Sequence, residues 1–264
     1  MLLANKNAVI YGAGGAIGAA VAHAFAREGA NVFLTGRNLA ALEVAAKEVT
    51  AAGGSAEAAA VDALDEQAVE RHADAVVARA GSLDISFNAI GIPQEGIQGT
   101  PLVELSVAGF GLPVATYTTA HFLTARAAAR RMLTQGSGVV ILTLTATPAR
   151  LAAPLVGGMA AAWAGVEALT RVLSAELGPH GIRVVCLRPD AIPETATIEV
   201  VFGQHANALG IAAEQFQAMA EGLTHRRRLP TLAEVANAAA FVASDQASAM
   251  TGTVVNLSGG TLVD

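Results

Sequence analysis

Two side chains that can exchange a proton lie four residues apart near the middle of the chain. Tyr117 is one of only two tyrosines, and His121 follows it at a spacing that places both on one helix face. An imidazole next to a phenol can activate it, so this pair has the composition of a general acid for a carbonyl or alcohol substrate. The competing interpretation is that Tyr117 fills space and His121 lies at a subunit contact.

Other polar residues offer hydroxyl, carboxyl or imidazole groups at less informative spacings. Thr145 lies in an apolar run and could bind a carbonyl oxygen, although threonine in a strand also serves packing. Four further candidate acids or bases fall in one long segment: Asp190, Glu194, His205 and Glu214. No cluster has the spacing of metal ligands, so we expect no metal.

A glycine-rich turn near the start of the chain has the composition of a phosphate-binding loop. Gly12, Gly14, Gly15 and Gly18 follow an apolar run, and Ile17 opens a helical pattern. Glycines let the backbone approach a pyrophosphate, and a helix N-terminus offers unpaired N–H groups and a positive dipole. The turn therefore predicts a dinucleotide site, with a turn retained only for packing as the alternative.

The end of the second apolar run indicates which dinucleotide is expected. An NAD site commonly has a carboxylate there to bind the ribose 2′-hydroxyl. This chain has Gly36 followed by Arg37. Because a guanidinium binds a 2′-phosphate with forked, charge-assisted hydrogen bonds, we expect NADP(H) as the cofactor. The alternative is an arginine at a helix start that faces water.

Short apolar runs alternate with helical patterns, which predicts one α/β domain over residues 1–264. The predicted strands are 8–11, 31–35, 58–61, 83–87, 139–144, 182–187 and 254–257. The predicted helices are 17–28, 39–51, 66–80, 117–133, 160–177 and 232–243. Continuous apolar runs are typical of parallel strands covered on both faces.

The predicted fold is a Rossmann-like, doubly wound, seven-stranded parallel sheet in a three-layer α/β/α sandwich. The segment at about 190–228 has no sheet-like pattern. Irregular segments of this length are usually functional, so we expect a substrate loop or lid there.

Taken together, the motifs resemble the short-chain dehydrogenase/reductase family over nearly the whole chain. Tyr11–Gly18 resembles its phosphate-binding turn, Gly165–Arg171 the helix after its catalytic Tyr-x-x-x-Lys, and Thr251–Gly260 its last strand. The resemblance implies further cofactor-binding positions at Asp62, Ala63 and Asn88.

The same resemblance implies that this chain lacks the family's catalytic residues. The family uses an Asn, a Ser, a Tyr and a Lys for proton transfer, and the matching positions here are held by Tyr117, Ala146, Met159 and Trp163. The only lysines are Lys6 and Lys47, and neither follows a tyrosine by four residues, so no Tyr-x-x-x-Lys exists in any register. We therefore expect the family's catalysis to be absent or strongly impaired, with Tyr117, His121 and Thr145 as possible substitutes. The apolar replacements, together with Ile90, hint at a small hydrophobic ligand.

Composition excludes several other roles. The chain is 53% hydrophobic and 14% charged, so its helices are expected to bury a second face in a homo-oligomer, a dimer or tetramer. A net charge of −6 without a basic stripe argues against nucleic acid as a partner. The long uncharged stretches are interrupted by Gly and Pro, which argues against a membrane span. A strand follows the N-terminus too soon for a signal peptide, so the cytoplasm is the expected location.

Three functions remain open from the sequence. The first is an NADP(H)-dependent oxidoreductase with displaced acid and base groups. The second is a nucleotide-binding pseudoenzyme that acts as a sensor or as a partner subunit. The third is non-redox chemistry in the inherited cleft.

Overall fold

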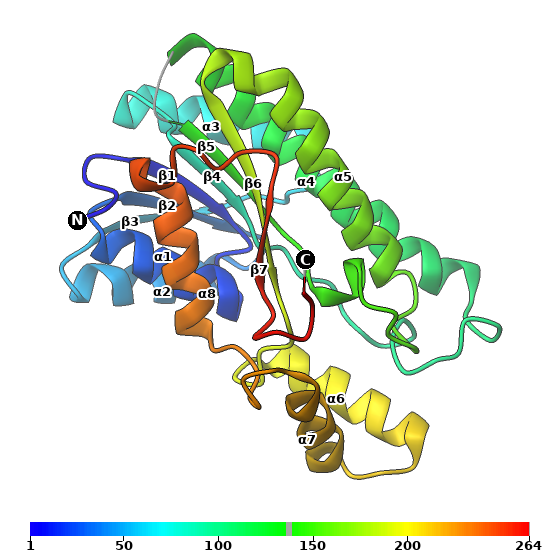
Figure 1. Ribbon diagram of the computed structural model, residues 1–264. Coiled ribbons are helices and arrows are strands. Elements are labelled where there is room, and N and C mark those ends of the chain that lie inside the picture. Colours follow the sequence, from blue (N-terminus) through cyan, green and yellow to red (C-terminus); the bar gives the residue numbers. More distant parts are fainter. Residues whose placement is uncertain (136–138, 264) are drawn as a thin grey trace.

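The computed structural model describes residues 1–135 and 139–263. Seven parallel strands form one sheet in the order β3-β2-β1-β4-β5-β6-β7 (Figure 1). The strands are β1 (Asn7–Tyr11), β2 (Asn31–Gly36), β3 (Ser55–Ala60), β4 (Ile85–Asn88), β5 (Val139–Leu144), β6 (Ile182–Pro189) and β7 (Val254–Leu257). The order reverses direction at β1, and this confirms the predicted Rossmann-like, doubly wound fold.

Helices cover both faces of the sheet. One layer contains α1 (Ala16–Arg27), α2 (Leu39–Ala51) and α8 (Leu232–Ala243), and the other contains α3 (Glu66–Ala80), α4 (Val107–Gln135) and α5 (Met159–Leu177) (Figure 1). Two separate apolar cores lie between the sheet and these layers, one on each face. The continuous apolar strands predicted this arrangement because side chains on both faces needed cover.

The structure changes the expected start of α4. The sequence predicted a helix from residue 117, whereas α4 begins at Val107. The Ser106 hydroxyl oxygen accepts a hydrogen bond from the Gly109 N–H at 3.0 Å and so caps the first turn. The sequence did not predict this part of the helix because it contains Gly109, Gly111 and Pro113, and glycine and proline usually mark the end of a helix.

The segment at about 190–228, which we predicted to be a substrate loop or lid, is mostly helical, and this corrects the expectation of an irregular loop. It contains α6 (Ala196–Leu209) and α7 (Ala213–Leu223), which pack on each other at the carboxyl edge of the sheet (Figure 1). Thr195 caps α6 through its hydroxyl, which accepts the Ile198 N–H at 3.3 Å. Ile198, Val201 and Phe202 recur at helical spacing and supply the apolar face that holds the pair of helices together.

Candidate functional site

A cavity of about 1240 Å³ lies between the carboxyl ends of the strands and the α6–α7 pair. It receives side chains or backbone from the glycine turn, from the ends of β2, β4, β5 and β6, and from α4 and α5. Ligands of doubly wound sheets bind at this edge, where the strand order reverses. The structure therefore brings most of the predicted nucleotide residues and part of the predicted chemical residues into one space.

The glycine turn is shaped by close backbone contacts. Gly12 has φ of +76°, and a Cβ on it would lie 2.5 Å from the Ala89 carbonyl oxygen. A Cβ on Gly18 would collide with the Gly12 carbonyl oxygen, so the start of α1 can lie against the turn only when both residues are glycine. Gly12, Gly14, Gly15 and Ile17 line the cavity, whereas Gly18 is buried behind them and serves packing.

The N-terminus of α1 faces the same space. Its N-cap residue is Gly15, which offers no side chain to the first-turn N–H groups, and Ala16 and Ile17 line the cavity. Unpaired N–H groups and the positive end of the helix dipole favour an anion such as a pyrophosphate. The turn and the helix start therefore fit a dinucleotide.

Arg37 lies at the rim of the cavity, where β2 ends at Gly36. Its side chain is exposed, and among the described residues no carboxylate forms an ion pair with it. The neighbouring Asn38 is already used as the cap of α2, since its Oδ1 accepts the Ala41 N–H at 3.3 Å. The guanidinium is thus accessible to a phosphate.

The remaining expected cofactor residues also line the cavity. Asp62 is exposed, and its Oδ1 accepts the Leu64 N–H at 3.0 Å, while Ala63 is buried. The Asn88 side chain is turned into the protein: its Nδ2 donates to Thr124 Oγ1 at 3.0 Å and its Oδ1 accepts the Ile90 N–H at 3.1 Å. Asn88 therefore anchors β4 to α4, and its side chain is not free to bind a ribose.

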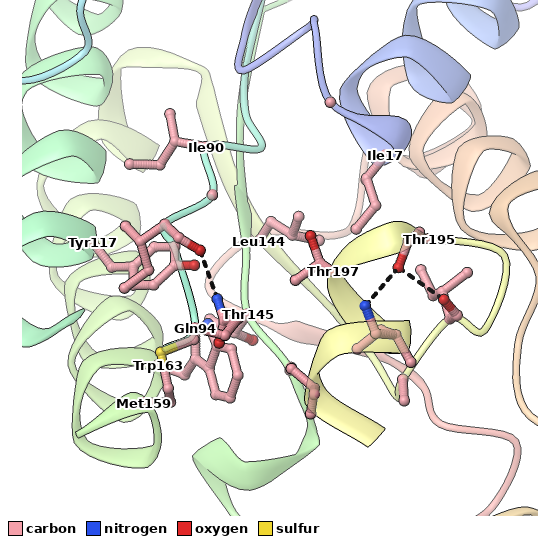
Figure 2. Close-up of a pocket in the computed structure, with 18 of the residues that line it drawn as sticks. Ile17, Ile90, Gln94, Tyr117, Leu144, Thr145, Met159, Trp163, Thr195 and Thr197 are labelled. Atoms are coloured by element: carbon pink, nitrogen blue, oxygen red, sulfur yellow. Dashed lines mark hydrogen bonds between the residues drawn. The ribbon is translucent and has the colours of Figure 1, made fainter. Parts of the chain in front are cut away.

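The four positions that the resemblance assigns to proton transfer all line the cavity. Tyr117, Met159 and Trp163 form part of one apolar cluster, with the Tyr117 and Trp163 rings 6.3 Å apart, and Ala146 follows β5. Figure 2 shows these three side chains together on the α4–α5 side, opposite Ile17 and the α6 residue Thr197. Burial raises the pKa of Tyr117 to about 12, and a hydrogen bond with the Ile92 backbone opposes this only in part.

His121 does not meet the Tyr117 hydroxyl. Its Nδ1–H donates to the Tyr117 backbone carbonyl at 2.8 Å, so its Nε2 is the acceptor and receives the Leu144 N–H at 3.4 Å. Burial lowers the pKa of His121 to about 4, so the ring is neutral at pH 7. The ring is 2% exposed, which corrects both expectations for it: it is not placed to activate the phenol, and it does not lie at a subunit contact.

Thr145 is likewise committed to the protein interior. Its hydroxyl donates to Glu167 Oε1 at 3.3 Å and lies 3.3 Å from the Cys186 sulfur. Glu167 is also paired with Arg188 at 3.2 Å, and both of these charged residues are buried. The hydroxyl proton of Thr145 therefore points to a carboxylate and not to a ligand oxygen in the cavity.

The acids and bases expected from the long segment are scattered. Asp190 and His205 line the cavity, whereas Glu214 does not, and Glu194 accepts the Leu232 N–H. Within the described residues, no three His, Cys, Asp or Glu side chains are grouped so as to hold a metal ion. No helix there combines the length and apolar character needed to cross a membrane.

Sequence reasoning missed the contribution of α6, α7 and the Ile92–Gln98 loop to the cavity. Ile198, Val201, Phe202 and His205 follow the spacing i, i+3, i+4, i+7, which is the signature of one helix face. This spacing indicates a helix, but the lack of a strand pattern in the same segment led to the prediction of a loop. Gln94 and Gln98 carried no comparable signal.

This fold and cavity define a class: a Rossmann-type domain with a dinucleotide-binding edge. A family model described as enoyl-(acyl carrier protein) reductase matches residues 12–261. An oxidoreductase of Bacillus subtilis with no assigned substrate is 33% identical over 258 residues, covering 98% of this chain and 91% of that protein. The chain therefore belongs to the short-chain dehydrogenase/reductase family.

Two solved structures show the likeness in three dimensions. An NAD⁺-bound xylitol dehydrogenase has a TM-score of 0.92 at 26% identity, covering 98% of this chain and 100% of that chain. A structure described as an NAD(P)-dependent gluconate 5-dehydrogenase from Beutenbergia cavernae, with bound NADP, has a TM-score of 0.87 at 29% identity, covering 99% and 98%. Relatives with this fold thus bind either nicotinamide dinucleotide.

Proposed function

We propose that the protein binds NADP(H) in preference to NAD(H) and is an oxidoreductase of its family without the family's proton relay. The observation that carries the cofactor preference is Arg37, an exposed guanidinium at the cavity rim where β2 ends. A carboxylate at this point would select the free 2′-hydroxyl of NAD(H), and Arg37 instead offers charge-assisted donors to a 2′-phosphate. The NADP-bound relative supports the same cofactor class.

The proposed oxidoreductase acts on a carbonyl or alcohol group. NADP(H), when bound, supplies or accepts the hydride. Tyr117 is the phenol in the cluster with Met159 and Trp163, and burial raises its pKa to about 12. A phenol with a raised pKa and no cation to lower it is a weak acid catalyst. Loss of a general acid typically costs about 10²- to 10⁴-fold in rate, so we expect any turnover to be slow by that order.

The first experiment is a calorimetric titration of nucleotide-free protein with NADPH and then with NADH. Micromolar NADPH binding with much weaker NADH binding is the expected result. Saturated protein is then mixed with a panel of aldehydes and ketones while NADPH absorbance is followed. Absence of binding by either nucleotide would refute the proposal, because the glycine turn would then serve packing only.

The second candidate is a nucleotide-binding pseudoenzyme. It is favoured by one observation: the polar atoms of His121 and Thr145 are engaged by protein groups, and Tyr117 is held at the Ile92 backbone. A restoration variant separates the two candidates: Tyr117→Asn, Ala146→Ser, Met159→Tyr and Trp163→Lys together. If wild-type protein binds NADPH without turnover and the folded variant reduces carbonyls, the wild-type chain is a pseudoenzyme.

We also propose that the protein forms a homo-oligomer through its α4–α5 side. These helices pack side by side on one face of the sheet (Figure 1). Phe122 is 42% exposed and Val172 is 54% exposed on them. Exposed large apolar side chains on a face that already covers the sheet are typical of a subunit contact.

A further inference from the structure

The part of the cavity beneath α6 and α7 has an almost continuous apolar lining. We call it the lid wall, and define it by the apolar cavity residues of α6, α7 and the segment 151–156. Its members include Val201 and Phe202 from α6, Phe216 and Met219 from α7, and Leu155. These residues lie far from the glycine turn in sequence, so the lid wall and the nucleotide end are built from different elements.

The lid wall carries no cation. Arg37 is the sole Lys or Arg among the described residues that line the cavity, and it lies at the nucleotide end. Asp190 also lines the cavity, and its carboxylate is held by the protein: Oδ1 accepts from the Thr147 hydroxyl at 3.0 Å and the Ala191 N–H at 2.8 Å, and Oδ2 accepts from the Thr261 hydroxyl at 2.6 Å. An anionic ligand group placed here would lose its water without gaining a countercharge.

The polar side chains beside the lid wall form a neutral, closed chain of hydrogen bonds. Gln94 Nε2 donates to the Ile92 carbonyl at 2.7 Å, and Gln98 Nε2 donates to Gln94 Oε1 at 2.7 Å. Gln98 Oε1 must then accept from His205 Nε2–H, 3.1 Å away. The His205 ring also lies 5.1 Å from the Phe216 ring, and burial lowers the pKa of His205, which keeps it uncharged.

We propose that the lid wall binds an uncharged, largely apolar alcohol or ketone, and that it discriminates against carboxylates, phosphate esters and polyols. The cavity volume of about 1240 Å³ exceeds the roughly 300–1,000 Å³ of ordinary small-molecule pockets, so a second ligand fits beside a nucleotide. A sugar acid or polyol, the kind of molecule named for the two structural relatives, would bury its charge or many hydroxyls against hydrocarbon. As a substrate assignment, the inference rests on the proposed function.

The test uses displacement of the neutral fluorescent probe N-phenyl-1-naphthylamine from the whole protein, with and without saturating NADPH. Competitors are 1-hexanol, 1-octanol, 1-decanol, decanoate and gluconate. Because each buried methylene contributes a constant free energy, the Kd of the alcohols should fall about fourfold per added methylene. Decanoate should bind at least about tenfold more weakly than 1-decanol, and gluconate should not displace the probe.

A lysine placed in the wall gives a matched pair of variants. Met219 lines the cavity and is 57% exposed, so Met219→Lys should fold and bring an ammonium to the wall. It should lower the ratio of the decanoate Kd to the 1-decanol Kd by about tenfold. Ala218→Lys adds the same charge to the neighbouring, exposed position that does not line the cavity, and should leave the ratio unchanged.

Several results would overturn the proposal: a flat alcohol series, decanoate binding as well as 1-decanol, displacement by gluconate, or the same response from both lysine variants. Probe binding that vanishes as protein concentration rises would also overturn it, because a second copy would then cover the wall. The two proposals fail separately. Loss of NADPH binding with an intact alcohol series refutes only the cofactor assignment, and NADPH binding with a flat series refutes only the ligand class.

Discussion

Arg37→Ala should weaken NADPH binding and leave NADH binding unchanged. A hydrogen bond to a charged group contributes about 1.5–3 kcal/mol, which corresponds to about 10- to 150-fold in Kd. Arg37 is exposed, so water and salt screen its charge and the lower end of this range applies. We therefore expect the NADPH Kd to rise about tenfold.

The assay is calorimetric titration at two ionic strengths. The effect should shrink at high salt, because exposed charges are screened over roughly 10 Å at 0.1 M. Arg71→Ala is the matched control, because it removes the same charge. Arg71 is an exposed arginine on α3 that does not line the cavity. Its NADPH Kd should equal that of the wild-type protein.

Arg37→Asp extends the same reasoning. A carboxylate at the end of β2 would accept from a ribose 2′-hydroxyl and repel a 2′-phosphate, so the preference should turn toward NADH. An unchanged NADPH Kd in Arg37→Ala, or an equal rise in Arg71→Ala, would refute the idea that Arg37 contacts the phosphate. Folding is not at issue, because Arg37 makes no ion pair among the described residues.

Three further outcomes follow from burial and charge. Glu167→Leu should lower the free energy of unfolding in denaturant by about 3–5 kcal/mol, because it removes the carboxylate of a buried ion pair. Burial lowers the pKa values of His121 and His72 to about 4 each. Their contribution to stability is therefore present above pH 6.5 and is lost as the pH falls from 6.5 toward 4. In His121→Gln, the slope of the unfolding free energy against pH over that interval should decrease by up to about 1.4 kcal/mol per pH unit. Phe122→Glu should shift the protein toward smaller species in sedimentation velocity, whereas Val44→Glu, which changes an exposed residue of α2, should not.

Most of the fold followed from one physical pattern. Continuous apolar strands separated by helical periods require a parallel sheet covered on both faces, and the structure has that sheet. The errors arose where local signals and tertiary packing disagree. Pro113 reads as a helix boundary, yet it lies inside α4, where it is buried. Likewise, apolar residues recur at helical spacing within 196–209, but over few turns. The helix there is supported by its packing on α7, which the sequence does not reveal.

The site was predictable where it depends on backbone and less so where it depends on side-chain direction. The glycines between a strand and a helix indicated the tight turn, and the structure adds the positive φ of Gly12 and its closeness to Ala89. Spacing also placed Tyr117 and His121 on one helix face, but it did not reveal that His121 bonds to the Tyr117 carbonyl one turn away. Such local side-chain-to-backbone bonds compete with any catalytic geometry and leave no mark in the sequence.

The two ends of the cavity are built independently, and this explains how one can change without the other. The nucleotide end consists of the backbone around Gly12, the start of α1 and the rim residue Arg37. Three of the positions assigned to proton transfer are instead side chains of α4 and α5, where Met159 and Trp163 pack on Tyr117. Substitution on α5 leaves the turn between β1 and α1 intact, because the two lie on opposite faces of the sheet. A substitution on α5 should therefore change turnover and leave nucleotide binding intact, whereas a variant that no longer binds the nucleotide should also lose turnover.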